Sequence, residues 1–101
     1  MMKRAVFLDR DGTLNVDKHY LSDPDQLDLI PGVGQALKRL QDAGFLLIIV
    51  TNQSGIGRGY YTEENMHAVN RRLINMLAPM GVRLTKIYYS PEAPEQPSVG
   101  R

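Results

Sequence analysis

The stretch "FLLIIV", residues 45–50, decides the fold, because it is an unbroken apolar run that ends in three β-branched side chains. It lies between Gly44 and the polar sequence "TNQSG". A short apolar run with such flanks predicts a strand buried on both faces, as in the centre of a parallel sheet. The apolar residues before it recur at helical spacing from Val33 to Leu40, and Gly44 is placed to cap that helix.

Further strands and helices surround this stretch in alternating order. Residues 5–8 are an apolar run that predicts a second strand, and residues 84–89 predict a third. Thr62 and the two glutamates after it predict the start of a second helix, with an inward stripe of Met66, Val69, Leu73, Met76, Leu77 and Met80. Between them, "SGIGRG", residues 54–59, predicts a glycine-rich loop. This order predicts an α/β fold, a parallel sheet with helices on both faces, in a single domain over residues 1–101.

Composition excludes several classes of protein. Twelve Lys and Arg against eleven Asp and Glu give a net charge of +1, without a long run of one sign, so we expect no nucleic-acid partner. No apolar stretch approaches the roughly 20 residues of a membrane span, and no signal peptide is recognisable, so we expect no membrane partner. Cysteine is absent, which fits a reducing compartment, and we expect a cytoplasmic protein.

The polar residues suited to chemistry follow the predicted strands. Asp9 and Asp11 come directly after the first strand, and Thr51 and Asn52 after the central one. The carboxyl ends of parallel strands meet at one edge of a sheet, where ligands bind. Mg²⁺ commonly takes one or two carboxylates together with phosphate oxygens. For "DRDGT" alone an ordinary Asp-Gly turn is the simpler interpretation, but the second strand end favours a phosphate-ester site, with Asp9 as nucleophile and Asp11 as general acid.

The motifs together resemble those of the haloacid dehalogenase (HAD) superfamily of phosphohydrolases. "FLDRDGTLN" (7–15), "PGV" (31–33), "VTNQSGIGRG" (50–59) and "IYYSP" (87–91) are most similar to its histidinol-phosphatase-like branch. The resemblance implies a Rossmann-like core, of which this chain is the N-terminal part. It also implies that Asp9 attacks phosphorus, that Asp11 is the acid and then the base, and that Mg²⁺ binds the Asp9 carboxylate and the Asp11 carbonyl. Thr51 would stabilise the transferring phosphoryl group, and Asn52 would position it.

The same resemblance implies a small phosphorylated sugar, such as a heptose bisphosphate, as substrate and partner. Residues of the matching segments are then expected to bind it: Asp17, Lys18, His19, Tyr20, Gln53 and Ser54, together with Arg101, which lies where the branch has the Arg that introduces its third motif. For Arg58, in the glycine-rich loop, contact with a substrate phosphate and an ordinary surface position are equal alternatives. The third and fourth motifs of the superfamily, a phosphate-binding Lys and an acidic magnesium ligand, would follow Arg101. We therefore expect the domain to be truncated before them, with the missing C-terminal segment as a partner if a longer protein is nicked.

No structural zinc is expected, although many members of this branch carry a zinc loop of Cys and His after the third strand. Ser90 stands where the first Cys would be, and no His follows it.

Three alternatives remain open from the sequence. Histidinol phosphate is the nearest rival substrate. A signalling receiver domain also builds an acidic magnesium pocket at strand ends, but its phosphorylated Asp ends the third strand, where this chain has Ser90. The 101-residue form could also be an inactive phosphate-binding fragment of such an enzyme.

Overall fold

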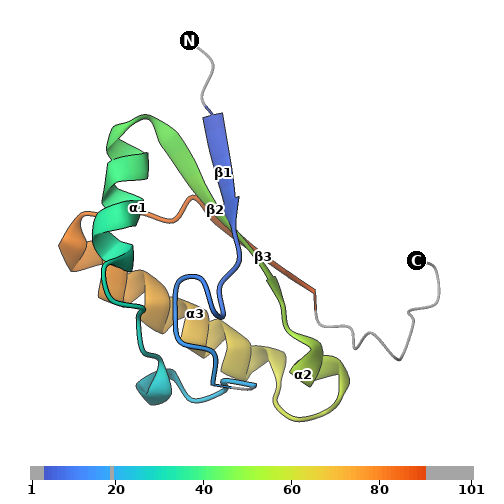
Figure 1. The fold of residues 1–101 in the computed structure, drawn as a ribbon. Coiled ribbons are helices and arrows are strands. Elements are labelled where there is room, and N and C mark those ends of the chain that lie inside the picture. The colour runs from blue at the N-terminus through green and yellow to red at the C-terminus, as the bar shows by residue number, and fades with distance from the viewer. Residues whose placement is uncertain (1–3, 19, 91–101) are drawn as a thin grey trace.

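A parallel sheet of three strands forms the centre of the structure, a computed structural model that describes residues 4–18 and 20–90. Strand β2 (Phe45–Asn52) lies between β1 (Arg4–Leu8) and β3 (Lys86–Ser90), and both pairings are parallel (Figure 1). Val6 lies opposite Leu47 and Ile49 opposite Ile87. The predicted α/β class, with "FLLIIV" as the central strand of a parallel sheet, is confirmed.

The largest differences from the predicted strand boundaries, two residues each, lie in β2 and β3. Strand β2 continues beyond Val50, because Thr51 pairs with Tyr89 and Asn52 with Ser90. Strand β3 begins at Lys86 and not at residue 84, although the Thr85 N–H already donates to the Leu47 carbonyl over 2.8 Å. Thr51 and Asn52, which the sequence predicts just after the central strand, are therefore its last two residues and are held in place by pairing with β3.

Two longer helices pack against the sheet. Helix α1 (Val33–Asp42) follows Gly32, which has a φ of 84°, and ends before Gly44, which has a φ of 97°. Helix α3 (Glu63–Leu77) begins as predicted after Thr62, whose hydroxyl accepts from the Asn65 N–H over 3.1 Å. Short 3₁₀ turns, η1 (Pro24–Gln26) and η2 (Ala78–Met80), complete the regular structure. In the ranges 4–18 and 20–90, no helix combines the length and apolarity needed to cross a membrane.

The expected glycine-rich loop contains a short helix, α2 (Ser54–Gly57). The Gln53 carbonyl accepts from the Ile56 N–H over 3.1 Å, and the Ser54 carbonyl accepts from the Arg58 N–H over 3.0 Å. Glycine weakens helices, but one turn closed by these hydrogen bonds tolerates it. Helix α2 extends directly from the end of β2 (Figure 1).

The hydrophobic core lies on one face of the sheet. Leu47 and Ile49 are fully buried there, in one cluster with Leu37 of α1 and Leu73 of α3. In the part of the chain that the structure describes, α1 and α3 lie on this same face (Figure 1), so the prediction of helices on both faces is wrong for it.

The opposite face of the sheet is exposed in the described residues. Phe7 is 65% exposed, Val50 47% and Tyr88 52%, one from each strand. The continuous apolar run of β2 suggested burial on both faces, whereas the described elements cover only alternate side chains. Met80 was also placed in the core stripe incorrectly, because α3 ends at Leu77 and Met80, in η2, is half exposed.

Candidate active site

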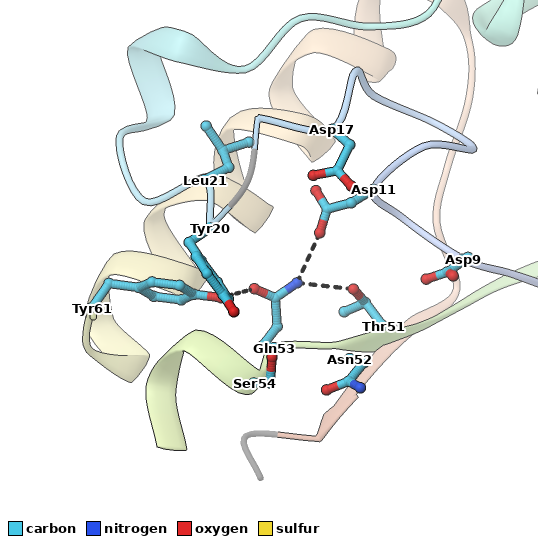
Figure 2. A pocket seen from close by; sticks show the side chains of 10 residues that line it. All are labelled: Asp9, Asp11, Asp17, Tyr20, Leu21, Thr51, Asn52, Gln53, Ser54 and Tyr61. Atoms are coloured by element: carbon cyan, nitrogen blue, oxygen red, sulfur yellow. Dashed lines mark hydrogen bonds between the residues drawn. The ribbon is translucent and has the colours of Figure 1, made fainter. Parts of the chain in front are cut away.

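A polar pocket of about 280 Å³ lies at the edge of the sheet where β1 and β2 end (Figure 2). Its wall brings together residues from the loop after β1, from the end of β2 and from the segment after α2. These are Asp9, Asp11, Asp17, Tyr20, Leu21, Thr51, Asn52, Gln53, Ser54 and Tyr61. The predicted convergence of the two aspartates with Thr51 and Asn52 is therefore present in the structure. The parallel pairing of β1 and β2 causes it, because both chains leave the sheet in the same direction.

Asp9 and Asp11 are separated by one residue but have different surroundings. Asp9 follows the last residue of β1 and is exposed at the pocket, with one carboxylate oxygen accepting the Arg10 N–H over 3.0 Å. Asp11 is only partly exposed, because the chain turns back after it through Gly12, whose φ is 85°. In this turn the Arg10 carbonyl accepts from the Leu14 N–H over 2.8 Å. One carboxylate thus faces an incoming ligand while the other is fixed by the protein.

Four side-chain nitrogen atoms from Arg10, Asn15 and Gln53 orient the Asp11 carboxylate, with Arg10 contributing most. One terminal guanidinium nitrogen of Arg10 lies 3.1 Å and 3.0 Å from the two Asp11 oxygens, and Nε lies 3.3 Å from Oδ1. Asn15 Nδ2 donates to Oδ1 over 2.9 Å, and Gln53 Nε2 donates to Oδ2 over 3.2 Å. Arg10 and Asn15 are fully buried, so these contacts form away from water. The carboxylate is held as an acceptor in a fixed orientation.

Gln53 connects the two strand ends. Its buried amide nitrogen donates to Asp11 and also to the Thr51 hydroxyl, 2.9 Å away, while its carbonyl oxygen accepts from the Tyr61 hydroxyl (Figure 2). Burial raises the pKa of the Tyr61 phenol; the Arg10 guanidinium opposes this rise, and the charges of Asp11 and Tyr20 add to it. Tyr61 is therefore protonated at neutral pH, which is the state that donates to Gln53.

The donor atoms at this edge suit a hard cation. Asp9, Asp11 and Asp17 offer only oxygen ligands, which Mg²⁺ prefers. Within residues 4–18 and 20–90, no group of three or more His, Cys, Asp or Glu side chains is arranged to hold a metal ion. An ion at Asp9 would therefore have to complete its shell with backbone carbonyl groups, water and ligand oxygens. That is the usual situation for Mg²⁺ at phosphate-binding sites.

The structure assembles some of the predicted substrate-binding residues and not others. Asp17, Tyr20, Gln53 and Ser54 line the pocket. Lys18 pairs instead with Asp28 over 2.7 Å, and neither Lys18 nor Arg58 contributes to the described pocket wall. His19 and Arg101 lie outside the described residues. The segment after Ser90, for which no zinc site is predicted, also lies outside them.

Four residues that shape the site are not predicted from the sequence: Arg10, Asn15, Tyr61 and Asn70. Arg10 stands between the two aspartates, and its side chain is completely buried and also donates to Asn70 of α3. Arginine is mostly exposed in proteins, so the sequence held no signal for its burial here. A weak signal existed for Asn70, a polar residue next to Val69 in the inward stripe of α3.

Comparison with known proteins places the chain in a family. A family model described as "Polynucleotide kinase 3 phosphatase" matches residues 4–100. The chain belongs to this family. Among curated proteins it is 52% identical over 96 residues to a D-glycero-beta-D-manno-heptose-1,7-bisphosphate 7-phosphatase of Haemophilus ducreyi, covering 94% of this chain and 53% of that protein. It is 48% identical to a protein of the same name from Pasteurella multocida, covering 93% of this chain and 51% of that protein.

A solved structure supports the same relationship. The D,D-heptose 1,7-bisphosphate phosphatase from B. bronchiseptica, complexed with magnesium and phosphate, superposes with a TM-score of 0.88 at 32% identity. The match covers 97% of this chain and 55% of that one. The predicted relationship to HAD-type phosphatases is thereby confirmed. The chain spans about half the length of the curated relatives it matches.

Proposed function

We propose that this chain carries the nucleophile and the acid–base residue of a magnesium-dependent phosphomonoester hydrolase. The substrate we propose is a heptose 1,7-bisphosphate, which is hydrolysed through an aspartyl-phosphate intermediate. The convergence of Asp9, Asp11, Thr51 and Asn52 on one pocket is the observation that carries this proposal. The names of the relatives from Haemophilus ducreyi and Pasteurella multocida supply the substrate.

Each half of the proposed reaction uses the two aspartates differently. In the first half an oxygen of the exposed Asp9 carboxylate forms a bond to phosphorus. The bond from phosphorus to the sugar oxygen breaks, and Asp11 gives its proton to that oxygen. In the second half water attacks the phosphorus of the aspartyl phosphate and passes its proton to Asp11, which releases inorganic phosphate and restores Asp9. The contacts from Arg10 and Gln53 orient the Asp11 carboxylate that is present after it has given up this proton and before it takes one from water.

The remaining pocket residues would bind the phosphoryl group and the cation. Thr51 and Asn52, fixed by strand pairing, present a hydroxyl and an amide beside Asp9. The Asp9 carboxylate and the Asp11 backbone carbonyl would hold Mg²⁺. When bound, the ion offsets the repulsion between the carboxylate and the phosphate anion. Its fit rests on the all-oxygen donor set of the pocket.

Turnover of the gene's full product on two substrates tests this proposal. We expect release of phosphate from heptose 1,7-bisphosphate in the presence of Mg²⁺, little release from histidinol phosphate, and none after chelation of the metal. Asp9→Asn should abolish turnover, whereas Asp42→Asn, a matched change at an exposed carboxylate of α1, should not alter it. Wild-type turnover in Asp9→Asn would show that Asp9 is not the nucleophile. Faster turnover of histidinol phosphate would overturn the choice of substrate.

The 101-residue chain itself is proposed to be a single domain that holds only part of such a site. The resemblance puts a phosphate-binding Lys and an acidic metal ligand outside it. Loss of one preorganised charged group typically lowers turnover by about 100-fold or more. We therefore expect the isolated chain to be severely impaired, and turnover equal to that of the full-length relatives would contradict this.

A further inference from the structure

We infer that Asn70, on helix α3, is a positioning residue for Asp11 and acts through the buried guanidinium of Arg10. The inference rests on the proposed function, because Asp11 is the acid and base of the proposed reaction. Asn70 does not line the pocket, and it lies 60 positions after Arg10 in the sequence. The contact therefore connects a helix behind the sheet to the chemistry at its edge.

The geometry of the Arg10 side chain supports this role. Its guanidinium is 0% exposed, so each of its hydrogen bonds forms without competition from water. One terminal nitrogen donates to the Asn70 side-chain oxygen over 2.9 Å, while the other bridges both oxygens of Asp11. Because the guanidinium is planar and rigid, fixing one nitrogen against Asn70 also fixes the other against Asp11.

Asn70 is itself held in place, which makes it a reliable anchor. It is 6% exposed, it follows the fully buried Val69 of α3, and its amide nitrogen donates to the sulfur of Met66 one turn earlier. This bond orients the amide so that its oxygen points toward Arg10. The Asp11 carboxylate, on the turn after β1, is thereby positioned against helix α3.

An apolar replacement at Asn70 should therefore lower kcat more than it weakens binding. For Asn70→Leu we expect a fall in kcat of about 10- to 100-fold, the usual effect of losing a group that orients an active-site ligand. KM and the inhibition constant of inorganic phosphate should change little, because Thr51 and Asn52 are untouched. Asn70→Asp keeps the acceptor for Arg10 and should restore most of kcat. Asn75→Leu, the same change at an exposed position of α3, is the matched control and should leave kcat unchanged.

A second measurement does not depend on activity. In the 101-residue chain, NMR signals of the Gln53 side-chain amide, which donates to Asp11, should shift in Asn70→Leu but not in Asn75→Leu. Unchanged Gln53 signals, or a folded Asn70→Leu enzyme with wild-type kcat, would overturn the inference. If Asn70→Leu does not fold, Arg10→Lys decides: it keeps the charge but cannot bridge both partners, so wild-type kcat there would also overturn it. If the wild-type enzyme is inactive but the Gln53 signals shift in Asn70→Leu, the proposed function is refuted and the positioning contact is supported.

Discussion

Replacing Gly55 with Ala should destabilise the protein and disturb the pocket at the same time. Gly55 is a buried residue of α2, and a Cβ atom added there would lie 2.2 Å from Cε1 of Tyr61 and 2.8 Å from Cδ1 of Tyr20. Carbon atoms in contact are separated by about 3.5–4.0 Å, so the Tyr61 ring would have to retreat by at least about 1 Å. Tyr61 is 8% exposed and donates to Gln53, which leaves its ring little room to move without losing that bond.

The size of the effect follows from these contacts. Forcing an extra methyl group into a packed site costs about 1–3 kcal/mol, and losing a hydrogen bond such as that from Tyr61 to Gln53 costs about 1 kcal/mol more. We expect the free energy of unfolding to fall by about 2–4 kcal/mol. With a urea dependence of about 1–3 kcal/mol per molar for a small domain, the midpoint of unfolding should fall by about 1 M or more.

Gly34→Ala provides a matched control. A Cβ atom there would lie 2.2 Å from the sulfur of Met80, but Met80 is half exposed and can turn into solvent. Alanine also favours the helix, by about 0.5–1 kcal/mol relative to glycine, so the stability of Gly34→Ala should stay within about 1 kcal/mol of wild type. Urea unfolding of both variants, followed by circular dichroism, makes the comparison. Equal midpoints for Gly55→Ala and wild type would refute the reasoning about Tyr61.

Three further predictions concern α3 and the two faces of the sheet. The pKa of Tyr89 is raised, mainly by its hydrogen bond to Glu63 and less by burial and by the charge of Glu63. The contact between Tyr89 and Glu63 therefore stabilises the fold below pH 10.0, and this stabilisation is lost as pH rises through the raised pKa. Glu63→Gln should lower the pKa measured from the phenolate absorbance, and an unchanged titration would contradict the contact. Thr62→Ala removes the cap of α3 and should cost about 0.5–2 kcal/mol in urea unfolding, so an unchanged midpoint would argue against the cap. In the 101-residue chain, Phe7→Ser on the exposed face should change the free energy of unfolding by less than about 0.5 kcal/mol. Leu47→Ala on the covered face should lower it by about 2–5 kcal/mol. Similar losses for both variants would contradict a one-sided core.

Local signals in the sequence were sufficient for most of the fold. The apolar run at 45–50, the helix start at Thr62 and the stop at Gly44 each depend on a few neighbouring residues, and all three agree with the structure. The predicted meeting of Asp9 with Thr51 needed only the rule that parallel strands end at the same edge.

Features that depend on distant contacts were beyond the sequence. Nothing in "DRDGT" distinguishes a surface Arg10 from one that is buried against Asn70, because the difference arises from the position of α3 in space. The coverage of the sheet likewise depends on where α1 and α3 pack, and the apolar run of β2 is compatible with one covered face or two. Gln53 is predicted to bind substrate, and the sequence carries no sign that the hydrogen bonds of its side chain go to Asp11, Thr51 and Tyr61.

The central claim is that Asp9 forms a covalent bond to phosphorus during turnover. It is tested most directly by mixing the gene's full product with heptose 1,7-bisphosphate and Mg²⁺, quenching with acid within a single turnover, and measuring the mass of the peptide that contains Asp9. We predict a fraction of that peptide heavier by one phosphoryl group, and no such fraction in Asp9→Asn. Rapid release of phosphate without any modified Asp9 peptide would contradict the claim.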